Sequence, residues 1–288
     1  KTKILCDPWF NGTAFGNGWS LLNDNSHNIN DIEFDYIWIS HEHPDHFSIP
    51  TLLKLQKKCT FLFQETNDKK VKKFLERKNH KVIELKHKEA TMFGDLELTS
   101  IACDGYDSSL LVKYPDGKIL LNINDARVEL NSHLDNEIVP LLKNETLDIL
   151  AFQMSYANWA GNKGDKNIPR FLQREADNKN DEAISKLKPK AILPFASFVY
   201  FSHEENFYWN DSNWLEHIFE RYSFIEPTLI FPIPDQSINL NIMDKSLFVI
   251  MGESGSGKTT LLNIISGIIK PQKGRVLFNE NLFSNNGP

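Results

Sequence analysis

The sequence lacks a surplus of basic residues. It has 32 lysines and arginines against 38 aspartates and glutamates, so its formal net charge is −6. Binding along a nucleic acid needs a concentrated basic face, and this balance therefore argues against a nucleic-acid partner. The basic stretch at residues 69–88 does not change this, because Glu76, Glu84 and Glu89 interleave with its lysines and indicate a solvated helix face.

Cysteines and long apolar runs are also scarce. The three cysteines, Cys6, Cys59 and Cys103, are too few and too scattered for a disulfide scaffold, and they suit a reducing cytoplasm. No apolar run approaches the ~20 residues of a membrane span, and no signal-peptide pattern opens the sequence. We therefore expect a cytoplasmic location and no membrane span in this chain. The sequence also lacks an initiator methionine, so we expect its N-terminus to be a cut.

Short strand-like segments follow one another along the chain. Residues Tyr36–Ser40 form a run of β-branched and aromatic residues, which predicts a buried strand. Asp116-Gly117, between two apolar runs, predicts a β-hairpin. Residues 68–78 predict a charged amphipathic helix. Four aromatic residues are expected to pack in the core, with the mouth of a substrate site beside His203 as the alternative: Phe207, Tyr208, Trp209 and Trp214. Trp9 and Trp19, on the early loop, are candidates for the pocket.

Four potential metal ligands lie within six residues, immediately after the strand at Tyr36–Ser40. They are His41, His43, Asp45 and His46, in the pattern HxHxDH. Neutral histidine nitrogens and aspartate oxygens suit zinc, iron or manganese. Alternate residues on a loop that leaves a strand can converge on one ion, while Asp45 and His46 face a second. The motif therefore predicts a metal centre, and two ions in it.

This motif resembles that of the metallo-β-lactamase superfamily. The resemblance implies an α/β fold, a four-layer αββα sandwich with metals at one edge of its two sheets. It also implies an aspartate that bridges both metals, matched by Asp125, and a late histidine, matched by His203. The third histidine of the usual pattern is missing. Asp104, Asp107 and Cys103 are the candidates to replace it, and we select Asp107; the alternative is a weak or empty first site.

A closer resemblance covers about residues 3–240. The segments Asp7–Gly12, Asn122–Asp125 and Pro194–Ser197 are similar to the hydrolase-like domain of CMP-N-acetylneuraminate hydroxylases and their bacterial relatives. Those hydroxylases also carry a Rieske iron–sulfur domain, whose Cys-x-His and Cys-x-x-His ligand pairs are absent from this sequence. The residues therefore favour metal-assisted hydrolysis over hydroxylation, with Asp45 or Asp125 orienting the attacking hydroxide. The expected substrate is a small ester, amide or phosphodiester, within a sugar or nucleotide derivative.

A glycine-rich loop near the C-terminus fits the pattern GxxxxGK[ST], between a predicted strand and a predicted helix. Its backbone N–H groups would cradle the phosphates of ATP, Lys258 would reach the β- and γ-phosphates, and Thr259 would bind Mg²⁺. The candidate nucleotide-binding residues are Gly252, Ser254, Gly255, Ser256, Gly257, Lys258, Thr259 and Thr260.

The flanks of this loop resemble ABC-transporter ATPases over about residues 243–288. Leu261–Gly267 and Lys270–Val276 follow that family. The family's signature motif and Walker B acid would lie beyond Pro288, so we expect the far end of the chain to be cut as well. This P-loop βαβ fragment could bind ATP, but ATPase activity would require the completed domain. The resemblance also implies a transporter membrane subunit as a partner of that completed domain.

The sequence therefore predicts two domains, at residues 1–242 and 243–288. We interpret the protein as a metal-dependent hydrolase of the metallo-β-lactamase fold joined to an ATP-binding segment. The alternative is an ABC-transporter ATP-binding subunit whose N-terminal domain is a non-catalytic metal or ligand binder. A third hypothesis is a junction without functional coupling between the two parts.

Overall fold

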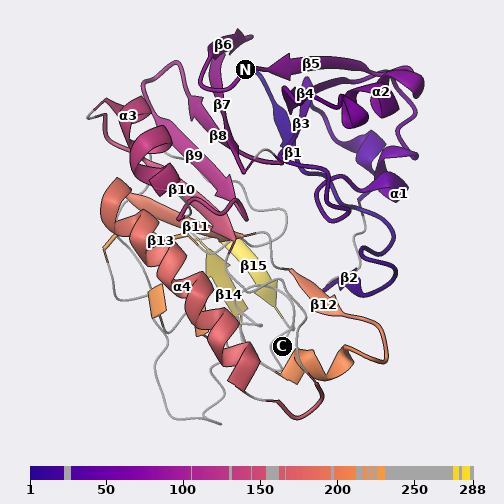
Figure 1. Ribbon diagram of the computed structural model, residues 1–288, viewed down its shortest axis with the longest axis vertical. Coiled ribbons are helices and arrows are strands. Elements are labelled where there is room, and N and C mark those ends of the chain that lie inside the picture. The colour runs from indigo at the N-terminus through magenta and orange to yellow at the C-terminus, as the bar shows by residue number, and fades with distance from the viewer. Residues whose placement is uncertain are drawn as a thin grey trace. The chain divides into compact units, whose positions relative to one another are not determined.

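The structure is a computed structural model, and the chain divides into two compact units, Lys1–Phe231 and Pro232–Pro288. The described residues are 1–22, 27–104, 106–129, 132–143, 145–153, 162–165, 167–195, 198–211, 217–218, 221–222, 226–230, 275–278 and 281–285. The first unit contains two large sheets (Figure 1).

The smaller sheet has four parallel strands in the order β1-β3-β4-β5. Helix α1 (Ile49–Leu52) begins after Ser48, whose hydroxyl accepts a hydrogen bond from the Thr51 N–H. Helix α2 (Lys70–Arg77) lies within the predicted residues 68–78. The strands are β1 (Ile4–Cys6), β3 (Tyr36–Ile39), β4 (Thr60–Gln64) and β5 (Lys81–Leu85).

The larger sheet has seven strands in the order β13-β11-β10-β9-β8-β7-β6. The predicted hairpin joins β8 to β9, with Gly117 at φ +82°, a conformation that favours glycine. The strands are β6 (Ala90–Phe93), β7 (Leu96–Cys103), β8 (Asp107–Lys113), β9 (Ile119–Asn124), β10 (Ile149–Gln153), β11 (Ala191–Phe195) and β13 (Thr228–Leu229).

Alternation along the strands divides the core into three layers. In β3, Ile37 and Ile39 pack with α1 and α2, whereas Trp38 points the other way and packs between the two sheets. In β8, Leu110 joins Trp38 between the sheets, while Leu111 faces the opposite side. Because successive strand side chains point to opposite faces, each sheet buries both of its faces.

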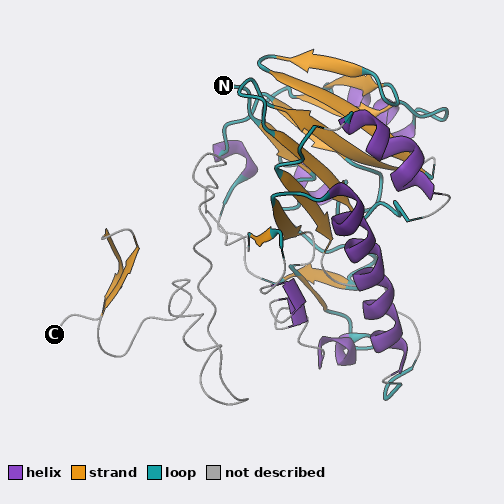
Figure 2. Cartoon of the chain, turned by 90° about the vertical axis from the view of Figure 1, so that its left-hand side faces the viewer, coloured by secondary structure: helices purple, strands orange, loops and turns teal. Residues whose placement is uncertain are grey.

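Helices cover the outer face of the larger sheet. Helix α4 (Asn167–Leu187) packs Ala183, Ile184 and Leu187 into the same cluster as Leu121 of β9. Figure 2 shows this long helix along the sheet. The order helix, sheet, sheet, helix is the predicted αββα sandwich. Shorter outer elements are the π-helical turn η3 (Leu134–Ile138) and helix α3 (Val139–Leu142).

Smaller elements of the first unit lie in its connections. Strand β2 (Trp19–Leu21) pairs antiparallel with β12 (Val199–Phe201), although the two are far apart in the sequence. Two 3₁₀ turns are also described in this unit, η1 (Ile29–Asp31) and η4 (Phe207–Asp211). No helix among the described residues is both long enough and apolar enough to span a membrane.

The second unit is described at two antiparallel strands, β14 (Arg275–Phe278) and β15 (Asn281–Asn285). The predicted phosphate-binding residues lie outside the described residues; they are Gly252, Ser254, Gly255, Ser256, Gly257, Lys258, Thr259 and Thr260. Their role stays a prediction from the sequence.

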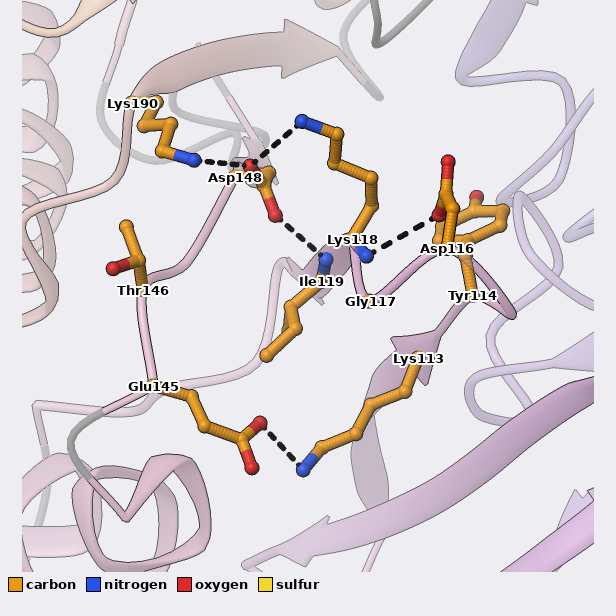
Figure 3. Close-up of a pocket in the computed structure, with 10 residues that line it drawn as sticks. All are labelled: Lys113, Tyr114, Asp116, Gly117, Lys118, Ile119, Glu145, Thr146, Asp148 and Lys190. Carbon is orange, nitrogen blue, oxygen red and sulfur yellow. Dashed lines mark hydrogen bonds and ion pairs between the residues drawn. The ribbon is translucent and has the colours of Figure 1, made fainter.

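A buried aspartate ties together the starts of three strands in the larger sheet. Asp148, 2% exposed, precedes β10 and accepts a hydrogen bond from the N–H of Ile119 at 2.9 Å. Its other oxygen lies 2.8 Å from Lys190 Nζ and 3.6 Å from Lys118 Nζ, at the wall of a cavity of about 610 Å³ (Figure 3). Burial raises the pKa of Asp148, but the bonds from Lys190 and Ile119 outweigh it, so the pKa lies below its ordinary value.

We expect Asp148→Asn to destabilise the fold at neutral pH by about 1–3 kcal/mol, because a buried acceptor of a cation and a backbone N–H is lost. The pKa of Asp148 is lower in the folded state, so its stabilisation is complete above the unfolded value of about 3.9 and is lost as the pH falls through the folded value. Urea unfolding at pH 7 and pH 3 measures both effects. The control Asp116→Asn, in the exposed hairpin turn, should change stability by less than about 0.5 kcal/mol. Equal stability of Asp148→Asn and wild type at pH 7 would contradict this expectation.

Candidate metal centre

Strand ends from both sheets bring the predicted metal ligands together. Strands β1 and β3 are parallel, so Asp7 and His41, which follow them, lie at the same edge of the smaller sheet. Strand β9 ends immediately before Asp125, and the antiparallel strand β8 begins at Asp107 on the same edge of the larger sheet. Polar side chains at such strand ends can converge without disturbing the apolar layers between them.

The convergent side chains form two groups that could each hold an ion. One consists of His41, His46 and Asp125, and the other of His41, His43 and Asp107. Within each group the ligand atoms lie within 4.8 Å of one another. His41 belongs to both groups and is 1% exposed, whereas His43 is exposed. Two adjacent groups that share a residue are an arrangement suited to two neighbouring ions.

The carboxylates of this centre fit a metal because each has one oxygen that is buried and makes no hydrogen bond. Asp45, Asp107 and Asp125 each have a buried Oδ1 atom with no hydrogen-bond partner. Asp45 Oδ2 lies 3.2 Å from His46 Nε2, and Asp125 Oδ2 lies 3.5 Å from the same nitrogen. An unpaired buried carboxylate oxygen is costly, and a cation would satisfy it. The donor set of nitrogens and oxygens therefore fits a transition-metal ion.

The carboxylates around His46 favour its protonated, positively charged form. Burial acts to lower the pKa of His46, but the charge of Asp125 and hydrogen bonds with Asp125, Asp45 and Asp7 hold it well above its ordinary value. Burial acts to raise the pKa of Asp125, but the charge and hydrogen bond of His46 hold it well below its usual range. Asp125 is therefore ionised, the state in which a carboxylate binds metal.

The second group has a different balance of burial and charge. Burial and the charge of His46 lower the pKa of His41, so its imidazole is neutral and can act as a ligand. Burial raises the pKa of Asp107, although His41 acts in the opposite direction. Asp107 Oδ1 lies 3.5 Å from His41 Nδ1, and His43 Nδ1 lies 2.8 Å from His41 Nε2.

Asp7 orients His46 and its neighbours through hydrogen bonds. The sequence did not predict this role. Its Oδ2 lies 3.1 Å from His46 Nδ1 and accepts hydrogen bonds from Asn124 Nδ2 and Ser40 Oγ, both at 2.7 Å. Its Oδ1 accepts the Ser40 N–H at 2.7 Å. A histidine whose Nδ1–H is held by a carboxylate presents Nε2 to a metal. The available signal was the position of Asp7, which ends a strand parallel to the one before the histidines.

Two further polar residues act on the centre, one through a hydrogen bond and the other through its charge. Ser108 Oγ donates a 2.7 Å hydrogen bond to the carbonyl of Ser40 and so connects β8 to the histidine loop. Lys179 on α4 also contributes to the field of the centre: burial lowers the pKa of Lys179, while the Asp125 charge raises it. Neither residue was predicted, because neither lies in a sequence motif for metal ligands.

The remaining predicted ligands differ in whether they belong to one of the two groups. Among the three candidates for the missing histidine, Asp107 lies with His41 and His43, whereas Asp104 and Cys103 belong to neither group of described residues. Burial raises the pKa of the Cys103 thiol to about 12. His203 is exposed, and the two groups found among the described residues do not include it. Its role as a ligand stays a prediction.

A cavity of about 380 Å³ lies next to the histidine loop. Glu42, between His41 and His43, lines it together with Tyr106, which precedes Asp107. Asp104 and Phe63 also contribute to its wall. The core prediction for the aromatic residues near His203 is confirmed for Trp209, which is 4% exposed. It is wrong for Phe207, which is 57% exposed. Trp214 lies outside the described residues.

Comparison with known proteins agrees with this two-part description. Residues 236–286 match the model of the ABC transporter family. The cytidine monophosphate-N-acetylneuraminic acid hydroxylase of Danio rerio is 26% identical over 228 residues, which cover 74% of this chain and 38% of that protein. The chain therefore spans well under half the length of this curated relative.

Solved structures match the first unit. The isothiocyanate hydrolase from Delia radicum gut bacteria is 15% identical, with a TM-score of 0.54 over 80% of this chain and 89% of that one. A possible metal-dependent hydrolase from Veillonella parvula is 13% identical, with a TM-score of 0.53 over 80% of this chain and 90% of that one. The chain therefore combines a body of the metallo-β-lactamase fold with a C-terminal segment that matches the ABC transporter family model.

Proposed function

We propose that residues 1–242 form a metal-dependent hydrolase domain. The observation that carries the proposal is the convergence of the two ligand groups with three buried carboxylate oxygens that lack a hydrogen-bond partner. We propose two ions, with zinc as the first candidate and iron or manganese as the others, because these metals accept histidine and aspartate together. His203 is proposed as a further ligand by the family resemblance.

The roles of the protein's own residues follow from their contacts. When bound, a transition metal lowers the pKa of water towards about 7 and polarises the oxygen of a carbonyl or phosphoryl group. His46 Nδ1 lies 3.1 Å from Asp7 Oδ2, so the tautomer protonated at Nδ1 leaves Nε2 for the reacting groups. Asp45 Oδ1 and Asp125 Oδ1 have no hydrogen-bond partner, so either oxygen can orient the attacking water. We therefore propose Asp45 and Asp125 as catalytic residues.

The substrate class that we propose is a small ester, amide or phosphodiester. The cavity beside the histidine loop offers space for a group attached to the scissile bond. The name of the zebrafish relative contains a nucleotide-linked sugar acid, which supports a sugar or nucleotide derivative. The three free cysteines, two of them buried, support a cytoplasmic location.

The second part of the proposal concerns ATP. The family match at residues 236–286 supports ATP and Mg²⁺ binding by the glycine-rich loop, residues 252–260. The same match favours the second candidate function, an ABC-transporter ATP-binding subunit with a non-catalytic N-terminal domain. ATP hydrolysis and contact with a transporter membrane subunit would then depend on the completed domain. The boundary between residues 242 and 243 also stays a proposal.

Hydrolysis of model substrates separates the two functions. We expect the full chain, loaded with zinc, to hydrolyse at least one of p-nitrophenyl acetate, a p-nitroanilide and bis(p-nitrophenyl) phosphate, and to lose this activity on treatment with a chelator. Released nitrophenol or nitroaniline is measured by absorbance, and bound metal by plasma mass spectrometry. A chain that binds ATP but takes up no transition metal and hydrolyses none of the three would contradict the hydrolase and favour the transporter subunit.

A further inference from the structure

Phe15 is an exposed aromatic residue at the candidate metal centre. Its ring centroid lies 6.2 Å from that of His43, at an interplanar angle of 62°. The residue is 45% exposed, and His43 beside it is exposed as well. A large apolar side chain in water beside a potential metal ligand has no role in the core.

The backbone holds Phe15 in an unusual conformation. Phe15 has φ +51°, followed by Gly16 at +62° and Asn17 at +70°. Positive φ is rare for a bulky residue and occurs where the surrounding structure enforces it, often at functional sites. The Gly18 N–H donates to the Phe15 carbonyl at 3.0 Å and closes this turn.

A buried aromatic residue and two hydrogen bonds hold this turn in place. The Phe15 ring packs edge-on against Trp19, with centroids 4.7 Å apart, and Trp19 is 7% exposed. The Ser202 N–H and Asn206 Nδ2 both donate to the Gly18 carbonyl, at 2.9 and 3.1 Å. The Phe15 ring therefore contacts both the buried ring of Trp19 and the exposed ring of His43.

We propose that Phe15 is a specificity-determining residue that packs against a planar aromatic group of the substrate, next to the atom that the metal centre attacks. This inference rests on the proposed function and adds a substrate class to it. Aromatic rings prefer offset-stacked or edge-to-face partners, and Phe15 already provides such an edge contact to His43 and Trp19. A fixed ring can bind a planar partner with little loss of side-chain freedom.

The test uses binding, so that it does not depend on turnover. The affinities of phenyl-, cyclohexyl- and methylphosphonate are measured by calorimetry on the full zinc-loaded chain. We expect phenylphosphonate to bind wild type about fivefold more tightly than methylphosphonate, as one well-packed aromatic pair would give. Phe15→Ala should abolish this difference, and Phe15→Leu should retain part of it. Phe171→Ala, at a 58% exposed phenylalanine of α4, is the matched control and should behave as wild type.

Each result decides between outcomes. Equal affinity of wild type for all three phosphonates, no binding of any, or an unchanged preference in Phe15→Ala would overturn the inference. If cyclohexylphosphonate bound as tightly as phenylphosphonate, the proposal that Phe15 selects a planar aromatic group would be overturned. A retained phenyl preference in a chain that hydrolyses no model substrate would leave the inference standing and contradict the hydrolase alone.

Discussion

Replacing His41 by alanine is expected to remove both ions from the candidate centre and to lower the rate of hydrolysis by at least about 10³-fold. His41 is the residue common to the two ligand groups, so each group loses one of its three ligands without it. A bound metal supplies several kcal/mol of transition-state stabilisation, and each 1.36 kcal/mol corresponds to a factor of ten. Metal content per chain and kcat/KM for the best model substrate measure the two losses.

A second histidine variant makes the result specific. His43 belongs to only one group and is exposed, so His43→Ala should fold normally and retain the ion held by His41, His46 and Asp125. His87→Gln is the control, since His87 pairs with Glu137 and lies outside both groups. Full metal content in His41→Ala, with circular dichroism like that of wild type, would contradict this assignment.

The second large effect is expected for Asp7→Asn. Asparagine has the same shape and tolerates the positive φ of Asp7, +41°, so the substitution changes the charge and the hydrogen bonds rather than the backbone. It places an amide NH₂ where Ser40 and Asn124 already donate. It also weakens the hold on His46 Nδ1. Removal of such a supporting carboxylate lowers metal affinity by about 10- to 100-fold.

The effect of Asp7→Asn should be confined to the group that contains His46. Titration of zinc against a competing chelator should give one weakened and one unchanged dissociation constant. The unsatisfied donors should also reduce stability by about 1–3 kcal/mol. Asp35→Asn is the matched control, because Asp35 is exposed just before β3 and accepts a hydrogen bond from the Lys3 N–H at 2.8 Å. Unchanged metal affinity together with reduced stability would mean that Asp7 has only a structural role.

Local sequence patterns predicted the parts of this fold that depend on neighbouring residues. The buried strand at Tyr36–Ser40, the turn at Asp116-Gly117 and the helix at residues 68–78 are determined within a few residues, and all three are present. The HxHxDH motif marked one ligand cluster because its residues are adjacent in the chain. Their partners Asp107 and Asp125 could be selected only through the family resemblance.

Contacts between distant segments could not be predicted in the same way. The pairing of β2 with β12 joins residues about 180 positions apart, and nothing within either segment specifies the other. Asp7 was missed for a similar reason. A single aspartate after a strand can hold a histidine of the centre only when β1 and β3 pair in parallel. Trp19, predicted as a weak candidate for the pocket, is buried beneath Phe15 instead.

Anomalous diffraction at the metal absorption edge, from crystals of the full zinc-loaded chain, tests the central claim most directly. The account predicts two peaks, one among His41, His46 and Asp125 and the other among His41, His43 and Asp107. It also predicts that the peak in the His43 group disappears in His43→Ala. Crystals with no peak at either group, or with zinc bound only elsewhere on the chain, would contradict the account.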